Sequence, residues 1–465
     1  MDYGALCLIP PVIAIVLSFL TKQVIPSLFI SLWVAATLVS GFNPGAGLVK
    51  AMNAIIAVLT SSTRNNIMAF AVIGIFTTLM GKVGGFTILA ETIGKIGVTS
   101  KKAVQALTTF IGTAIFMASS VSVLTTGAVV RPMSEKYKLS SEKLSFLLDA
   151  TAAPVCSLTL IGPWGALLMG LLAAQGITED AATAFGAIKY NFYAIFMYIL
   201  VWFTVITGKE FGPMKLAEER ADKTGKIIRD GVANLGGSEE FEAPAKGTNL
   251  LTILAPLGTL IAGVFYFLWL TGKGNILKGS GGLSFVYACT VAILVSIAIL
   301  YVQRCINLAT ISDCITKGVS KMATVIVIIV LAVGLSAIVK DMHTGQYLAQ
   351  FTTGFLSPKF LPAIIFVLSC IMSFATGTSY GTMGIMIPIA IPLASTLGIN
   401  FELVTGAVLA GAVFGDHCSP ISDTTIIASM AAGANHLDHV TTQMYYAVAA
   451  GIAAVIGYVV LGLVA

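Results

Sequence analysis

Charged side chains are the scarcest class of residue in this sequence. Only 10% of the 465 residues are Asp, Glu, Lys or Arg, whereas 57% are hydrophobic. A soluble domain carries about 25% charged residues, and a chain this apolar could not cover a water-facing surface with polar groups. The composition therefore excludes an ordinary soluble protein and predicts that lipid surrounds most of the chain.

Other absences exclude further classes. The seven cysteines are scattered, mostly inside apolar runs, which is typical of small core residues and not of a disulfide framework. The first apolar run, Leu6–Leu20, follows Asp2 without the basic leader of a signal peptide, so we expect it to be the first membrane helix. No His-Glu-x-x-His motif occurs, which argues against an intramembrane metalloprotease. We expect neither enzymatic activity nor a resident cofactor.

Long apolar runs fill most of the chain. Runs such as Ile253–Leu270, Leu283–Val302, Met322–Val339 and Met444–Leu463 have the length of a membrane-spanning helix. They are too continuous for the alternating pattern of a β-barrel strand. We expect an all-α polytopic protein of the bacterial cytoplasmic (inner) membrane with about 11–13 transmembrane elements, some of them short or broken.

One polar segment, residues 208–248, divides the chain near its middle. It holds a dense run of mixed charges, and such runs are usually solvated. We interpret residues 1–207 and 249–465 as two membrane halves joined by a cytoplasmic linker. The net charge of +5 does not indicate nucleic acid, because excess Lys and Arg in a membrane protein mostly mark cytoplasmic loops.

The two halves resemble each other in order. In the first half, Phe116–Gly127 leads to Leu147–Leu158; in the second, Phe374–Ile385 leads to Phe414–Thr425. In both, a stretch rich in Ser, Thr and Gly is followed by Asp, then Pro, then Ser. Inverted repeats with broken helices are a common plan of secondary transporters. Chance similarity between two apolar strings is the alternative.

Basic residues flank the first polar interruption on both sides. If both basic loops are cytoplasmic, the segment between them cannot cross the membrane and must return as a re-entrant hairpin with its tip at Ser119–Ser122. The second half has the same shape, with arms Leu361–Ala375 and Met383–Leu397 and a tip at Thr376–Thr382. The flanking basic residues are Lys95, Lys101, Lys102, Arg131, Lys136, Lys138 and Lys143 in the first half and Lys359 in the second.

Hydroxyl side chains gather at both predicted tips. Lipid tolerates irregular backbone only where protein buries it or water reaches it, so such breaks need a reason. Thr376, Thr378 and Ser379 offer oxygen ligands, which a hard cation such as sodium prefers; packing through small residues is the alternative. Ser119 and Ser120 could serve the same purpose or bond back to their own helix.

Three carboxylates lie within apolar surroundings. An ionised Asp inside a span costs about 2.5–3.5 kcal/mol, so Asp149 needs a partner, a cation or a proton. Asp416 and Asp423 stand on either side of Pro420, which would bend them around a cavity. Close carboxylates raise each other's proton affinity, so this pair could hold either a proton or a sodium ion.

Three histidines accompany these groups. We expect His436 and His439 to lie in a polar surface turn before the last helix, with pH sensing as the alternative. The role of His417 is left open.

The polar motifs resemble those of the NhaC family of sodium/proton antiporters. "FGDHCSPISDTT" (Phe414–Thr425) and "NHLDHVTTQMYYA" (Asn435–Ala447) are similar to the family signature, and "FATGTSYGTMGIMIPIA" (Phe374–Ala390) to the motif before it. The first half agrees less sharply, through "LDATAAPVCSL" and "GPWGA". The resemblance implies the ion transporter superfamily, whose members combine paired re-entrant hairpins and broken helices with an elevator-like motion.

The resemblance also implies a site. It would place Asp416, Ser419, Ser422, Asp423 and Thr424 at the ion, with Thr376, Thr378 and Ser379 at the hairpin tip; by the repeat, Ser119, Ser120, Asp149 and Ser157 form the partner half. Sodium would bind at Asp416, Asp423, Thr378 and Ser379.

Sodium/proton antiport is therefore the function that we expect, with sodium and protons as the transported partners. Sodium- or proton-coupled carriage of an amino acid or small carboxylate is the alternative, since some family members carry such solutes. A passive channel is less compatible with internal repeats and broken helices. Homodimer formation is left open.

Overall fold

Apolar runs of this length fold as helices because lipid offers backbone groups no hydrogen-bond partners of its own. The computed structural model describes residues 3–60, 63–95, 98–177, 180–229, 245, 247–344, 347 and 357–464, and every regular element within these ranges is a helix. Eight helical segments are long and apolar enough to cross a membrane, and three bent helix pairs raise the number to 11. The predicted all-α polytopic fold is confirmed.

The helices of the two halves have the following bounds. The first half contains η1 (Gly4–Leu8), α1 (Ile9–Thr21), α2 (Val24–Val39), α3 (Pro44–Thr60), α4 (Thr63–Lys82), α5 (Gly85–Gly94), α6 (Lys101–Ala114), α7 (Ser119–Lys136), α8 (Ser141–Ala150), α9 (Ala153–Thr159), α10 (Pro163–Ala174), α11 (Asp180–Ile188) and α12 (Phe192–Thr207). After α13 (Gly212–Thr224), the second half contains α14 (Leu250–Thr271), η2 (Ile276–Lys278), α15 (Gly281–Val302), α16 (Leu308–Asp341), η3 (Pro358–Phe360), α18 (Leu361–Thr376), α19 (Ser379–Leu397), α20 (Phe401–Cys418), α21 (Asp423–Ala432) and α22 (His436–Val464).

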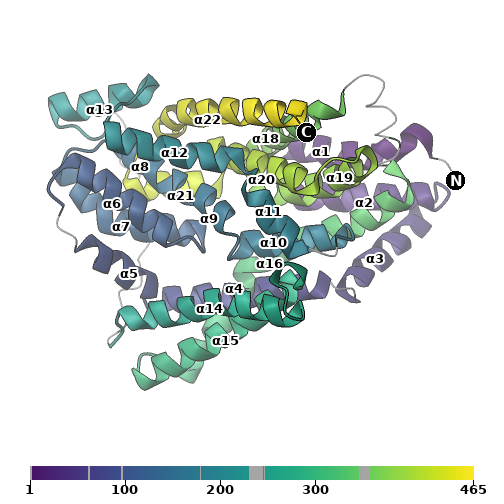
Figure 1. Cartoon of the computed structure of the whole chain (residues 1–465), viewed down its shortest axis with the longest axis horizontal. Helices are drawn as coiled ribbons and strands as arrows, with labels where there is room; N and C mark the ends of the chain where they lie inside the picture. Colours follow the sequence, from purple (N-terminus) through teal and green to yellow (C-terminus); the bar gives the residue numbers. More distant parts are fainter. Residues whose placement is uncertain are drawn as a thin grey trace.

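The helices pack in two groups. In one, α14 pairs with α15, and both α15 and α16 pack on α4. In the other, α20 packs between α18 and α19, and α21 packs on α7 and α8. Figure 1 shows the hairpin α6–α7 on one side of this second group, and α18 and α19 beyond α20 on the other.

Both predicted hairpin tips are breaks between helices. α6 ends at Ala114 and α7 begins at Ser119, while the Ser122 hydroxyl donates to the Gly112 carbonyl at 3.0 Å and ties the two arms together. In the second hairpin, α18 ends at Thr376 and Gly377 adopts the left-handed conformation (φ +64°) that frees the chain to turn into α19.

The bases of the two hairpins lie at opposite ends of α22, which has 29 residues and is about 43 Å long at 1.5 Å per residue. Near its start, Asp438 pairs with Arg229 at 3.1 Å, on the side of α13, which also holds Lys101 at the base of the first hairpin. Near its end, the Leu463 carbonyl accepts a hydrogen bond from Lys359, which precedes α18. The hairpins therefore enter from opposite ends of the bundle, as inverted repeats require.

The polar linker differs from the simple solvated segment that the charge run predicts. Its residues 212–224 form α13, whose Met214, Ala217, Glu218 and Ala221 are buried. Glu218 accepts a hydrogen bond from the Ser140 amide at 2.9 Å, so this amphipathic helix docks beside α8. Residues 230–244 and 246 of the linker lie outside the described residues.

α18 and α20 approach closely at glycines. A Cβ atom at Gly415 would stand 2.5 Å from the Cys370 carbonyl oxygen, a distance that real Cβ atoms do not show. Small residues at such crossings let membrane helices pack through their backbones.

Gly415→Ala should therefore destabilise the fold by about 1–3 kcal/mol, because it overpacks this crossing. The measurement is the thermal unfolding midpoint of the purified protein in detergent. Gly258→Ala is the matched control, because nothing lies within 4 Å of its added Cβ. Equal midpoints for the two variants would contradict the proposed close packing.

Candidate functional site

The Asp416 carboxylate joins two chain breaks. Asp416 lies in the last turn of α20 and is 5% exposed. Its Oδ2 accepts a hydrogen bond from the Ser379 hydroxyl at 2.5 Å, and its Oδ1 accepts one from the Ser422 hydroxyl at 2.7 Å. Ser379 is the first residue of α19, and Ser422 is the N-cap of α21. Three of the side chains predicted at the ion, Ser379, Asp416 and Ser422, thus meet from α19, α20 and the start of α21.

Further oxygens complete this cluster. Thr424 Oγ1 lies 3.0 Å from Ser422 Oγ, and the Thr425 hydroxyl donates to the Asp416 carbonyl at 3.4 Å. None of the ion pairs among the described residues involves Asp416, so no Lys or Arg neutralises it. A buried carboxylate surrounded by hydroxyls is a donor set suited to a hard cation such as sodium. We call Ser379, Asp416, Ser422 and Thr424 the oxygen cluster.

The two breaks touch each other. A Cβ atom at Gly377 would lie 2.9 Å from the Ile421 carbonyl oxygen in the break between α20 and α21. Ser419 bridges the same two segments, because its hydroxyl donates to the Phe374 carbonyl at 2.8 Å. α20 ends two residues before Pro420, which has no amide hydrogen to continue a helix.

Asp423 makes no side-chain hydrogen bond to Asp416 among the described residues, although the two carboxylates are close enough to interact electrostatically. Asp423 is the first residue of α21, its side chain is exposed, and its Oδ1 accepts a hydrogen bond from the Thr424 amide at 2.8 Å. The two carboxylates stand on either side of the break at 419–422, which contains Pro420 as the sequence predicted.

The other hydroxyls of the second hairpin bond to the backbone. The Thr376 hydroxyl donates to the Met372 carbonyl at 2.9 Å, within α18. Thr378 is the N-cap of α19 and accepts a hydrogen bond from the Gly381 amide at 3.4 Å. In this conformation both side chains bond to the backbone beside the break.

The predicted partner half is held by different contacts. Ser119 is half-buried at the start of α7 and hydrogen-bonds with Cys156 of α9, and Ser120 is half-buried beside it. The Ser157 hydroxyl donates to the Pro154 carbonyl at 2.7 Å and accepts a hydrogen bond from Asn191 at 2.9 Å. Within the part of the chain that the structure describes, no hydrogen bond of these three serines reaches the oxygen cluster.

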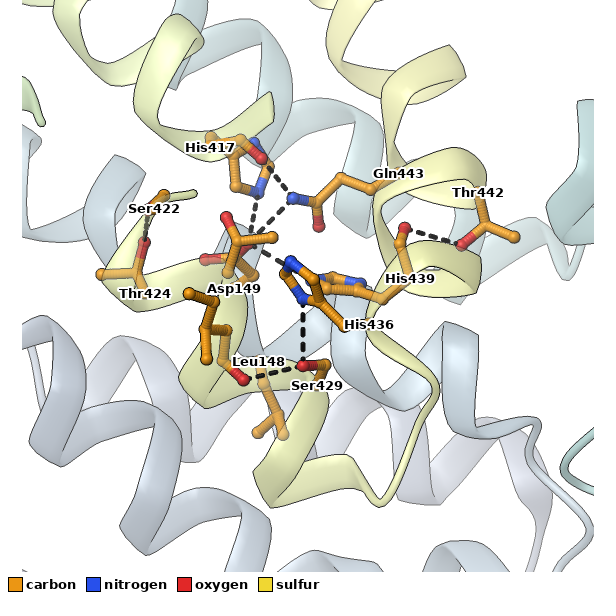
Figure 2. A network of polar contacts seen from close by, with 12 residues as sticks. Leu148, Asp149, His417, Ser422, Thr424, Ser429, His436, His439, Thr442 and Gln443 are labelled. Atoms are coloured by element: carbon orange, nitrogen blue, oxygen red, sulfur yellow. Dashed lines mark hydrogen bonds and ion pairs between the residues drawn. The ribbon is translucent and has the colours of Figure 1, made fainter. Parts of the chain in front are cut away.

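Asp149 is the centre of a second buried cluster, which Figure 2 shows. It is fully buried in α8, and its Oδ2 accepts a hydrogen bond from Gln443 Nε2 at 2.8 Å. His439 Nε2 lies 3.4 Å from the same oxygen, and His417 Nε2 lies 3.9 Å from it. On its other side, His417 Nδ1 contacts the Tyr193 hydroxyl at 2.6 Å.

The prediction of a surface turn at His436 and His439 is wrong for His439. Its side chain is fully buried, because α22 begins at His436 and carries His439 inward, while His436 is half-buried. Sequence reasoning also missed Gln443. The spacing of 436, 439 and 443 places all three on one helix face, a signal that the neighbouring polar residues obscured.

Cavities open at both ends of α16. One of about 260 Å³ is lined by Thr78, Lys317, Val121 and Thr125, so it reaches α7 close to Ser119. The other, of about 920 Å³, is lined by Ser336 and Lys340 near the far end of α16 and by residues 388–396 of α19. The two cavities approach the two hairpins from opposite ends of the molecule.

Opposed hairpins, a buried carboxylate at their breaks and cavities at both ends of the bundle define an ion-coupled membrane transporter. The chain belongs to the Na⁺/H⁺ antiporter family, whose model matches residues 155–463. The resemblance to NhaC-type transporters is confirmed, and the chain is a multi-pass protein of the bacterial inner membrane, as predicted.

Related proteins support this assignment over different shares of the chain. An uncharacterized protein of Haemophilus influenzae is 32% identical over 98% of this chain and 90% of its own length. The malate-2H⁺/Na⁺-lactate antiporter of Bacillus subtilis is 36% identical over 28% of this chain and 30% of its own. The Na⁺/H⁺ antiporter NhaC of Alkalihalophilus pseudofirmus is 32% identical over 23% of each chain.

Two solved transporters share the fold. MtrF of Neisseria gonorrhoeae superposes with a TM-score of 0.58 at 17% identity, covering 89% of this chain and 84% of its own. The YdaH transporter of Alcanivorax borkumensis superposes with a TM-score of 0.60 at 14% identity, covering 89% and 87%. At these identities the likeness concerns the fold alone.

Proposed function

We propose that this protein exchanges sodium for protons across the membrane, with sodium held by the oxygen cluster. The observation that carries the proposal is the buried Asp416 carboxylate, which receives hydroxyls from two chain breaks and has no basic partner among the described residues. An ionised carboxylate is costly at such a place unless a cation or a proton neutralises it. Asp416 therefore alternates between sodium and a proton.

Rotation of the hydroxyls makes this alternation possible. Ser379 and Ser422 now donate their protons to Asp416; when sodium binds, the same hydroxyls turn their lone pairs toward the ion. The break at 419–422 and the tip at Gly377 leave room for such adjustment, because neither segment is fixed by a continuous helical hydrogen-bond ladder.

Alternating access follows from the two hairpins. We propose that the helices carrying the breaks move in an elevator-like manner against the group formed by α4, α14, α15 and α16. The cavities at the two ends of α16 support this proposal, since each provides an open approach to one hairpin. The family membership supports the choice of ions.

The deciding experiment uses the purified protein in liposomes that contain a pH-sensitive dye. An imposed sodium gradient should drive proton movement in the opposite direction without any organic solute. An unchanged dye signal, together with sodium-dependent uptake of a solute from a mixture of amino acids and small carboxylates, would refute sodium/proton antiport.

A second function, sodium-coupled transport of a small organic anion, is favoured by one observation. Lys82, Lys317 and Lys321 line the cavity of about 260 Å³ beside α7, whereas Asp313 is the carboxylate among its lining residues. This excess of positive charge would attract a carboxylate. The malate and lactate named for the Bacillus subtilis relative are solutes of this kind.

Asp423→Asn should raise the KM for sodium by about tenfold and change the maximal rate less, because an exposed carboxylate attracts cations without holding them. The measurement is the initial rate of ²²Na⁺ uptake at several sodium concentrations. An unchanged KM would remove Asp423 from the path of the ion, and complete loss of transport would make it a ligand.

A further inference from the structure

The side chains around Asp149, which we call the Asp149 cluster, form a second buried polar site beside the oxygen cluster. Asp149, His417, His439 and Gln443 come from α8, α20 and α22, and all four side chains are at most 5% exposed. Figure 2 shows them converging on the Asp149 carboxylate from different helices. The Asp149 cluster and the oxygen cluster are both connected to α20, because His417 belongs to the first and Asp416 to the second. These successive residues point about 100° apart on the helix.

The hydrogen-bonding capacity of this cluster is incompletely used. Asp149 Oδ1, His439 Nδ1 and Gln443 Oε1 have no hydrogen-bond partner among the described residues, and His439 Nε2 has only its 3.4 Å contact with Asp149 Oδ2. Buried polar atoms are normally satisfied, and an unsatisfied one costs free energy. A proton on Asp149 would supply a donor for one of these unused acceptors.

Gln443 links the charge of Asp149 to the site helix. Its Nε2 donates to Asp149 Oδ2 at 2.8 Å and also to the His417 carbonyl at the end of α20. When Asp149 is protonated, it becomes a donor and needs an acceptor at that position. Turning the Gln443 amide by 180° exchanges Oε1 for Nε2, which satisfies the protonated acid and releases the His417 carbonyl next to Asp416.

The end of α22 that faces α13 carries a partly exposed carboxylate beside the Asp149 cluster. Asp438, next to His439 in the chain, has a side chain that is 19% exposed and pairs with Arg229 at 3.1 Å. His439 is the next residue of α22, and its Nε2 approaches Asp149 Oδ2 to 3.4 Å. Imidazole passes protons readily near neutral pH.

Several ionisable groups face Asp149 from the elements around it. They are His439 on α22, His417, Cys418 and Asp416 on α20, Tyr193 on α12 and Asp423 on α21. Lys143, on the same helix as Asp149, pairs instead with Glu210. The imidazoles favour an ionised Asp149 and the other carboxylates oppose it, so its charge responds to what Asp416 holds.

We propose that Asp149, assisted by His439, binds a second transported proton, so that each exchange cycle moves net charge. This inference rests on the proposed sodium/proton exchange and assigns a separate site to part of it. Asp416 gives up one proton when sodium binds, and Asp149 gives up another on the same side of the membrane. One sodium ion then moves against more than one proton, and a membrane potential drives the exchange.

Asp149→Asn tests the proposal by separating two driving forces. ²²Na⁺ uptake into liposomes is driven either by a pH gradient alone or, at equal pH, by an inside-positive potential set with valinomycin and potassium. The wild type should respond to both. The variant should keep the uptake that is driven by the pH gradient. Its rate of uptake driven by the potential should fall by about tenfold or more.

The outcomes separate this inference from the proposed function. If the wild type fails to respond to a pH gradient, sodium/proton exchange itself is wrong and the inference falls with it. If the wild type exchanges but ignores the potential, or if Asp149→Asn still responds to it, only the second proton site is refuted. Loss of both modes in a folded Asp149→Asn protein would place Asp149 in the cation site and also refute the proposal.

Two further variants control for misfolding as the cause of a lost response. His439→Asn removes the nearest imidazole, so the buried carboxyl should stay protonated and the response to potential should again be lost selectively. Asp180→Asn is the matched control for a buried carboxylate, because Asp180 accepts the Ala181 and Gly281 amides, which an Asn oxygen also accepts. It should retain both modes.

Discussion

Asp416→Asn is expected to reduce sodium-dependent transport by about 100-fold or more, equivalent to ~2.8 kcal/mol. The amide keeps the shape of the carboxylate and can still accept a hydroxyl hydrogen bond, but it carries no charge to offset the cost of dehydrating sodium. Because Asp416 is 5% exposed and has no basic partner among the described residues, no other charge within the oxygen cluster replaces it. The measurement is ²²Na⁺ uptake driven by a pH gradient.

The control for this variant is Asp222→Asn. Asp222 is an exposed carboxylate of α13 that pairs with Lys101 at 2.8 Å, and Glu218 remains to pair with the same lysine at 2.7 Å. Its transport rate should stay close to that of the wild type. Near-normal transport by Asp416→Asn would show that the oxygen cluster does not hold the ion.

Lys143→Met is expected to destabilise the protein by about 3–5 kcal/mol, because it leaves a buried charge without its partner. Lys143 is fully buried and contacts Glu210 at 2.8 Å and the Thr204 hydroxyl at 2.9 Å. Its ammonium also lies 5.0 Å from the ring centre of Phe146. The unpaired Glu210 side chain, 6% exposed, would then carry an uncompensated charge.

The double variant Lys143→Met/Glu210→Gln separates this cause from simple loss of packing. Removing both charges should recover most of the lost stability, since replacing a whole buried ion pair is often nearly neutral. Thermal unfolding midpoints of the wild type, both single variants and the double variant in detergent give the coupling. If the double variant is no more stable than Lys143→Met, the ion pair is not the reason.

The sequence predicted the parts of the site that local chemistry dictates. Glycine and hydroxyl residues at 376–382 interrupt an apolar run, and the structure places the break there. Asp416, Ser422 and Thr424 are close in the chain, so Pro420 and the following residues already implied a turn that gathers them. Ser379 joined them through the family resemblance.

The Asp149 cluster was less accessible to sequence reasoning. The contact between Asp149 and Gln443 joins residues 294 positions apart, and no local pattern fixes how α22 packs on α8. The docking of α13 was missed for a similar reason, because the charge density of this segment favoured a short exposed helix over one with a buried face beside α8. Tertiary packing decided both features.

Calorimetric titration of the purified protein with sodium chloride, at constant ionic strength maintained with choline chloride, tests the central claim most directly. The account predicts saturable sodium binding by the wild type whose apparent Kd rises by up to about tenfold for each unit that the pH is lowered, and no binding by Asp416→Asn. Equal sodium binding by the variant, or an affinity independent of pH, would contradict it.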